Sequence, residues 1–173
     1  MIRVALSSLI VSLGGIGATF ANAQVSAAVP SASMNVCGKD VELGSMPKVV
    51  FDKFEGTGCT VYKVAGDPDL FAIGKGSAQV GTVKFSHGQL ATITREWAAD
   101  IKSPEEFARA VVNALQEVQA HGSPECALST LNQADPSFEA RGTVMKCGRR
   151  TLVFSVNAES GQEKFQIEEI LGG

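Results

Sequence analysis

Residues 81–97, GTVKFSHGQLATITREW, have the clearest strand pattern in the chain. Apolar and polar residues alternate on either side of His87-Gly88, which is typical of a β-hairpin closed by a two-residue turn. In that register we expect Phe85 to lie opposite Leu90 and Val83 opposite Thr92, which makes one face of the hairpin apolar. The stretch therefore predicts two paired antiparallel strands with one face turned to a core.

A further pair of strand-like runs precedes this hairpin and has the same period of two. The runs are CTVYKVA from residue 59 and LFAIGK from residue 70, and the turn sequences GDPD and GS follow them. Short turns between runs rich in β-branched and aromatic residues indicate an antiparallel meander. Before the meander, SMPKVVFDKF at residues 45–54 predicts a short helix with Val50 and Phe54 on its buried face.

Residues 103–122, SPEEFARAVVNALQEVQAHG, predict the longest helix of the chain. Ser103 is the capping residue, Pro104 stands in the first turn and Gly122 follows the last periodic residue. Four more strand-like runs come after the helix. By helical spacing the expected buried stripe is Phe107, Val111, Leu115 and Val118.

The chain thus follows one plan twice, with little identity between the two halves. We predict an α+β fold of two helix-plus-antiparallel-meander units, each with about four strands and with the helices packed on one sheet face. The first unit is expected over residues 35–97 and the second over 98–173. The sequence leaves open whether the two sheets join edge to edge.

The N-terminal residues predict export. Residues 1–23 place Arg3 before an apolar run that ends in Ala-Asn-Ala, the order of a secretory signal peptide cleaved after Ala23. The small, weakly polar residues 24–34 predict a flexible leader. We expect a periplasmic or secreted protein that keeps no membrane anchor after cleavage.

The four cysteines are expected to form two disulfides. An even number of cysteines in an exported chain of 173 residues favours disulfides, although four cysteines allow three pairings. If residues 126–147 form a hairpin, Cys126 lies opposite Cys147. Cys37 and Cys59 then form the second pair.

The charge of the chain excludes two classes of partner. The formal net charge is −3, and no run of basic residues occurs. Nucleic acids and anionic membrane surfaces attract basic proteins, so we expect neither as a partner. A protein remains the predicted partner.

The first unit, residues 43–97, resembles the SmpA/OmlA-type outer-membrane-assembly lipoproteins and the β-lactamase inhibitor protein. The matching positions are Gly44, Met46 and Pro47 at the helix start, Phe85, Gly88 and Leu90 in the hairpin, and Arg95 and Trp97 beyond it. The resemblance implies a protein that binds other proteins on a concave sheet and has no catalytic activity. The chain departs from the pattern at Ser45, lacks the lipid-carrying cysteine, and has one long helix in its second half.

No catalytic or metal-binding set is evident. Ser45 and Lys48 match the Ser-x-x-Lys pattern of penicillin-recognising enzymes, but a helix start explains this serine. His87 precedes a turn glycine and His121 ends a helix, and neither has a second metal ligand at a suitable spacing. We therefore predict no metal and no cofactor.

Arginine and aromatic residues are the candidate protein contacts. Strand alternation places Arg95 and Trp97 on the hairpin face opposite Phe85, and Arg-Trp pairs are frequent in interfaces. Arg149 and Arg150 stand at a predicted hairpin tip, where adjacent guanidinium groups can bind a carboxylate.

These features favour an exported, non-enzymatic protein-binding module of the cell envelope or periplasm. The alternative, suggested by the resemblance, is an inhibitor of an exported hydrolase. A third hypothesis is a small exported enzyme that uses carboxylates, which would have to converge in one pocket. The carboxylates in question are Asp67, Asp69, Glu168 and Glu169.

Overall fold

The structure is a computed structural model that describes residues 32–172 except 99–100, 102, 124, 136–137 and 160–161. The predicted signal peptide and most of the predicted leader lie outside the described residues. Two helices and ten strands are described: β1 (Ser33–Val36), β2 (Lys39–Glu42), α1 (Pro47–Asp52), β3 (Cys59–Lys63), β4 (Leu70–Lys75), β5 (Ala78–Ser86), β6 (Gln89–Glu96), α2 (Pro104–His121), β7 (Cys126–Asp135), β8 (Phe138–Cys147), β9 (Arg150–Glu159) and β10 (Gln162–Gly172).

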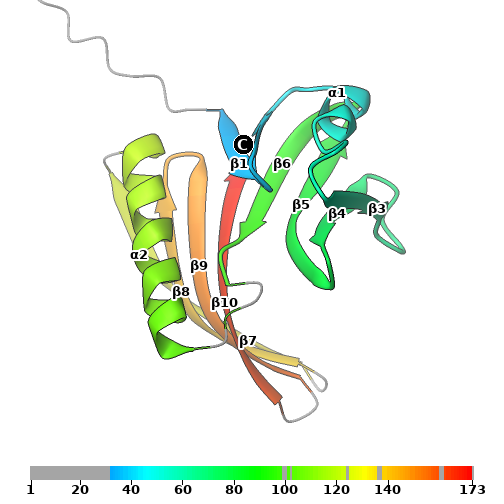
Figure 1. Cartoon of the computed structure of the whole chain (residues 1–173). Coiled ribbons are helices and arrows are strands. Elements are labelled where there is room, and N and C mark those ends of the chain that lie inside the picture. Colours follow the sequence, from blue (N-terminus) through cyan, green and yellow to red (C-terminus); the bar gives the residue numbers. More distant parts are fainter. Residues whose placement is uncertain are drawn as a thin grey trace, which may run out of the picture.

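The strands form one twisted antiparallel sheet and one separate hairpin (Figure 1). The order in the sheet is β3-β4-β5-β6-β10-β9-β8-β7, and β1 pairs only with β2. The last strand, β10, returns to the middle of the sheet and pairs with β6, with Glu169 opposite Arg95. This pairing joins the strands of both halves into a continuous eight-stranded sheet.

The predicted fold class of two helix-plus-meander units is therefore wrong, because the described fold is mostly antiparallel β with a single shared sheet. The short helix expected in the first half is present as α1, and Val50 and Phe54 are buried as predicted. The β1–β2 hairpin covers this half together with α1. Met34, Val36 and Val41 of the hairpin join the buried apolar cluster around Ile93.

A β-bulge in the β5–β6 hairpin changes which face its residues occupy. Phe85 pairs with Leu90 as expected, but the register then shifts, so that Val83 pairs with Ile93 and not with Thr92. One extra residue in a strand moves every following side chain to the other face. Beyond the bulge, the odd-numbered residues of β6 thus share the core face with Phe85.

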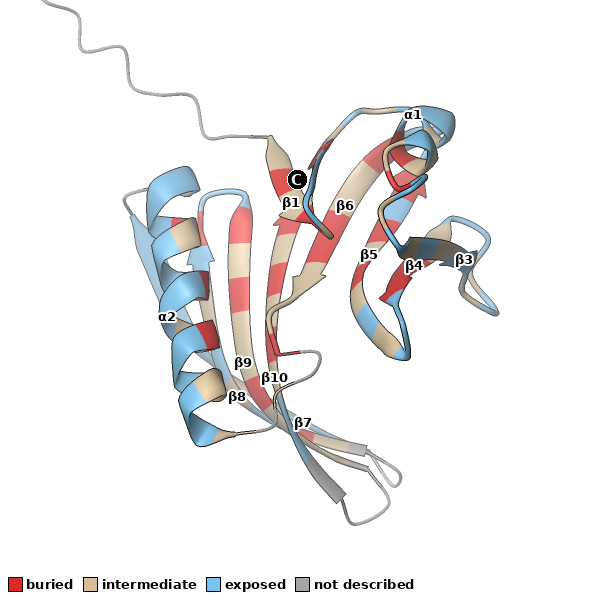
Figure 2. Cartoon of the chain, viewed as in Figure 1, coloured by how far each residue is buried: buried red, intermediate tan, exposed pale blue. Residues whose placement is uncertain are grey.

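Helix α2 is confirmed, and Val118, Phe107 and Val111 of the expected stripe join the apolar cluster, but the helix is rotated so that Ala110 and Ala114 face the sheet in place of Leu115. The Ser103 hydroxyl accepts a hydrogen bond from the Glu106 amide, as the capping pattern predicts. The helix packs mainly on β9 and β10, and its buried residues are Ala110, Ala114 and Val118. Leu115 is 39% exposed, and the outward face of α2 is exposed in Figure 2. In the described part of the chain, no helix is long and apolar enough to cross a membrane.

Both predicted disulfides are present. Cys37 is bonded to Cys59, which joins the turn after β1 to the start of β3. Cys126 is bonded to Cys147, its direct partner in the β7–β8 ladder. Two such bonds indicate an oxidising environment.

Candidate functional site

Three of the four predicted contact residues meet inside the protein around one carboxylate, that of Glu169. Oε2 of Glu169 accepts hydrogen bonds from Arg95 Nη2 at 2.5 Å and from Trp97 Nε1 at 3.1 Å. Oε1 accepts a hydrogen bond from Arg150 Nη1. We call Arg95, Trp97, Arg150 and Glu169 the arginine–glutamate cluster.

The strand register explains why the cluster forms. Glu169 on β10 pairs directly with Arg95 on β6, and Arg150 on β9 pairs with Leu171, two residues along β10. Residues two apart in a strand share a face, so all the charged groups point to the core side of the sheet. The guanidinium carbon of Arg95 also lies 3.9 Å from the centre of the Trp97 ring, within the range of a cation–π contact.

The cluster binds the N-terminal hairpin and α2 to the sheet. Arg95 Nη1 donates to the backbone carbonyl of Asn35 at 3.0 Å, and Arg150 Nη2 donates to the carbonyl of Ser33 at 2.5 Å. On the other side, Glu117 of α2 lies 3.3 Å from Arg95 Nη2. Two cations thus face two anions, and the charges compensate each other.

Burial of the cluster corrects the predicted contact surface. Glu169 and Arg150 are 0% and 1% exposed, and Arg150 therefore binds an internal carboxylate and is not at an exposed hairpin tip. The bulge in β6 placed Arg95 and Trp97 on the core face, where both are partly buried. Of the predicted contacts only Arg149 is exposed. The cluster holds elements together, and its carboxylate has both oxygens bonded to donors.

The opposite face of the sheet takes no part in either apolar cluster. One row of paired residues crosses all eight strands on this face, and two of its members, Thr82 and Thr94, bring their hydroxyl groups into contact. We call this surface the open face. Its central row is Tyr62, Ala72, Thr82, Thr94, Ile170, Thr151, Lys146 and Ala127.

Two carboxylates face each other beside this row. Glu168 of β10 pairs directly with Glu96 of β6, and both are half-buried. Burial raises the pKa of Glu168 to about 7, and the charge of Glu96 adds to this effect. Burial also raises the pKa of Glu96, and this effect is opposed by a 2.6 Å hydrogen bond from Gln166 Nε2 and by the charge of Lys164. The Gln166 amide oxygen in turn accepts a bond from Asn157.

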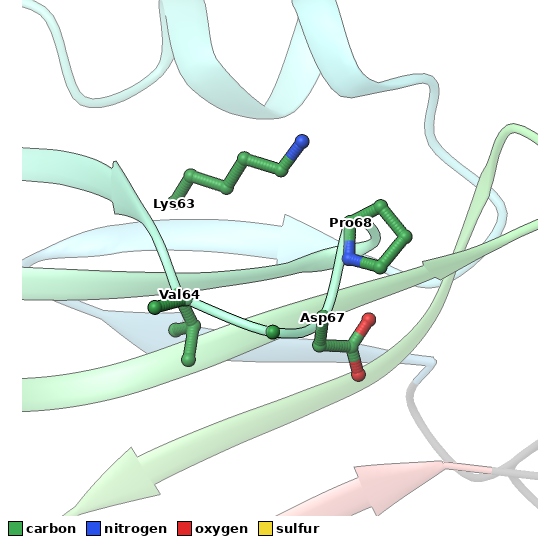
Figure 3. Close-up of a pocket in the computed structure, with 6 residues that line it drawn as sticks. Lys63, Val64, Asp67 and Pro68 are labelled. Carbon is green, nitrogen blue, oxygen red and sulfur yellow. The ribbon is translucent and has the colours of Figure 1, made fainter.

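The carboxylates of the enzyme hypothesis do not converge. Glu168 and Glu169 are neighbours in one strand and point to opposite faces. Asp67 lies in the turn between β3 and β4, beside a shallow depression of about 430 Å³ shown in Figure 3. Its carboxylate binds Lys84 at 2.9 Å and accepts the Asp69 amide at 3.0 Å, and the hydrogen bond from Lys84 lowers its pKa. These carboxylates serve separate local roles.

The two histidines are also separate. His87 adopts φ of 52° in the turn before Gly88, as its sequence position predicts, and contacts the Ser86 hydroxyl at 3.0 Å. His121 ends α2, 3.9 Å from Glu117. Within the described ranges, no three His, Cys, Asp or Glu side chains gather in a way that would hold a metal ion.

Sequence reasoning missed the role of Glu169 and the face of Glu96. In KFQIEEI, alternation places Glu169 with Ile167 on the apolar face, and a carboxylate in a core position requires a buried partner. That signal was present in the sequence. No comparable signal indicated that Glu96 lies opposite Glu168, because that arrangement depends on the pairing of β6 with β10.

Comparison with models of known protein families gives no match, and comparison with curated proteins gives no significant match. The resemblance of residues 43–97 to assembly lipoproteins and to the inhibitor protein therefore stays an expectation. The function has to be argued from the surfaces described above.

Proposed function

We propose that the chain is an exported, non-enzymatic protein-binding module of the cell envelope or periplasm. Two features support export: the signal-like residues 1–23 and the pair of disulfides, which suit an oxidising compartment. Cleavage after Ala23 would leave the folded region with a short leader.

The open face is the observation that supports protein binding. All eight strands contribute to it, and its side chains are mostly small or polar. In its central row Ala72 and Thr94 are buried, whereas Tyr62, Lys146 and Ala127 toward the two ends are exposed. Small molecules are usually bound in enclosed clefts lined by apolar groups, whereas protein partners bind wide, shallow surfaces. The contribution of all eight strands and the polar chemistry of the open face suit a folded protein partner.

The paired carboxylates define what that partner presents. Glu96 and Glu168 oppose each other without a cation directly bonded to Glu168 among the described residues. A Lys or Arg of the partner, placed between them, would bind both carboxylates and lower the pKa of Glu168 again. The expected partner is therefore a protein with a basic side chain that projects from a polar surface.

Capture from an envelope extract tests this proposal. The oxidised chain is compared with Glu96→Gln/Glu168→Gln and with a control, Glu105→Gln/Glu125→Gln, whose two glutamates are exposed outside the open face. We expect the native chain and the control to retain the same protein, with retention weakened by salt. Loss of retention in the open-face variant supports the proposal. Equal retention by all three chains removes the open face as the contact surface.

A further inference from the structure

A second surface, the free edge of β7, has the properties of a pairing site. β7 stands at one end of the eight-stranded sheet, so the outer side of its backbone has no strand partner in the described part of the chain. From Cys126 to Ala134 every side chain is exposed except that of Leu131, which is half-buried. Leu128 is 72% exposed. Long, unpaired edges of this kind pair readily with another strand.

The opposite edge of the sheet, formed by β3, is protected against pairing with another strand, whereas the β7 edge is not. β3 has five residues and ends in Lys63, and Lys75 stands beside its first residue in the ladder. A short edge with lysines discourages pairing. β7 has ten residues, CALSTLNQAD, with no proline and no charge before the last one. Only one of the two edges therefore lacks the usual protection.

The lack of charge along β7 favours a second copy as the occupant. Copies with a net charge of −3 repel each other, so a contact between them requires an uncharged surface. No strand of the sheet has a longer uncharged run than β7. When β7 pairs with itself in antiparallel orientation, no like charges face each other along residues 126–134.

We propose that two copies of the chain form a two-fold symmetric dimer in which β7 pairs with β7, so that both sheets become one. Residues that pair across the two copies must lie on the same face of the joined sheet. The two-fold axis therefore passes midway between the two copies of one residue. With Thr130 at the axis, Cys126 lies opposite Ala134, so residues 126–134 of each copy pair along their whole length, and the exposed Leu128 lies opposite Asn132.

Two further features fit a closed dimer. The Cys126–Cys147 disulfide bonds the start of β7 to β8, so the edge is held in its sheet position before pairing. Each copy offers one unprotected edge, and pairing that edge with itself uses it completely. The assembly therefore stops at two copies and does not grow into a filament.

Sedimentation of the oxidised, exported chain over a wide range of concentrations tests the proposal. We expect a reversible monomer–dimer equilibrium. Thr130→Lys should weaken it at least about tenfold, because the substitution places two lysines directly opposite each other at the axis. The matched control is Val112→Lys on α2, which changes a residue that is 50% exposed away from β7 and should leave the equilibrium unchanged. A monomer at every concentration, or a dimer that survives Thr130→Lys, overturns the proposal.

Amide hydrogen exchange of the native chain gives a readout that depends on no variant. Protection of residues 126–134 should rise with protein concentration, whereas protection of β3 should not change. Protection of both edges, or the formation of long polymers, would indicate pairing between β7 and β3 and overturn the symmetric dimer. The dimer concerns the sheet edge, so this experiment reports on it independently of the open face.

Discussion

Glu169 pairs with Arg95 across the β10–β6 ladder, and its Oε2 accepts a 2.5 Å hydrogen bond from Arg95 Nη2. This pair lies where the last strand of the chain joins the first four strands of the sheet. Arg95 and Arg150 also hold backbone carbonyls of β1. One buried carboxylate thus orients two arginines that connect the N-terminal hairpin with the sheet.

We predict that Glu169→Gln lowers the free energy of unfolding by about 3–5 kcal/mol, because it leaves two guanidinium groups near the core without their shared anion. Urea unfolding at neutral pH measures the loss. Glu117→Gln is the control: Glu117 also contacts Arg95 but is partly exposed, so its loss should cost about 1 kcal/mol or less. Equal costs for both variants would contradict the central role of Glu169.

Stability should fall as the pH rises through the range in which Glu168 ionises. Its pKa is raised to about 7 in the folded protein, so the folded state holds this proton above the pH at which the unfolded chain has lost it. The stabilisation that comes from protonated Glu168 is complete below the pKa that this group has in the unfolded chain. It is lost as the pH rises through its folded pKa of about 7. We expect at most about 2 kcal/mol, since Glu168 is only half-buried.

Glu168→Gln should remove this slope and stabilise the protein at pH 8. Glu96→Gln should reduce the slope, because the charge of Glu96 contributes to the raised pKa of Glu168. Urea unfolding between pH 5 and pH 8 compares the three chains. An unchanged slope in Glu168→Gln would show that another group titrates.

Gly81→Ala should destabilise the protein by about 1–3 kcal/mol. A Cβ at Gly81 would lie 2.3 Å from the backbone oxygen of Thr94 and 3.1 Å from Val36 of the N-terminal hairpin. The control is Gly74→Ala, where the nearest atom is 3.1 Å away at the ring of the exposed Tyr62, which can move. Thermal unfolding distinguishes them, and a similar loss in both would argue against the close approach of Gly81 to the Thr94 backbone.

Each disulfide should contribute about 2–4 kcal/mol, mainly by restricting the unfolded chain. The bonded cysteines are 22 and 21 residues apart, so the two loops should have similar effects. Double alanine variants at each pair and urea unfolding measure the contributions. A thiol reagent should add no mass to the native, non-reduced protein. Mass added at two sites would show that one bond is missing.

The rotation of α2 predicts opposite sensitivities at adjacent residues. Ala114 is 0% exposed against the sheet, so Ala114→Leu should cost about 1–3 kcal/mol through overpacking. Leu115→Ala removes a partly exposed side chain and should cost less than a core leucine would, about 1 kcal/mol. If Leu115→Ala is the more damaging change, α2 presents the face that its sequence pattern predicts.

Local sequence patterns predicted most elements of this fold. The turn residues His87-Gly88, the cap at Ser103 and the period of two in the strand runs depend on interactions between near neighbours, and all appear as expected. The Cys126–Cys147 bond followed from one hairpin. Strand faces were less predictable, because a single bulged residue near Phe85 reverses the face of everything after it.

The candidate sites likewise divide into features that the sequence predicted and features that depend on the strand pairing. Arg95 and Trp97 were identified as a pair from the sequence, and they do lie together. They lie on the core face, however, and both are hydrogen-bonded to Glu169, which the sequence analysis had assigned to the enzyme hypothesis. The open face and its opposed carboxylates required knowledge of a strand pairing between residues 72 positions apart.

The sequence by itself determined the elements, their turns and caps, and the pairing of Cys126 with Cys147, because these depend on contacts close along the chain. The tertiary structure alone decided that β10 returns to β6, that the β1–β2 hairpin packs with α1 on the first half of the sheet, and that β7 lies at one end of the sheet. The physical reason is that these arrangements depend on strands far apart in the chain, whose apolar faces can be buried together in more than one order.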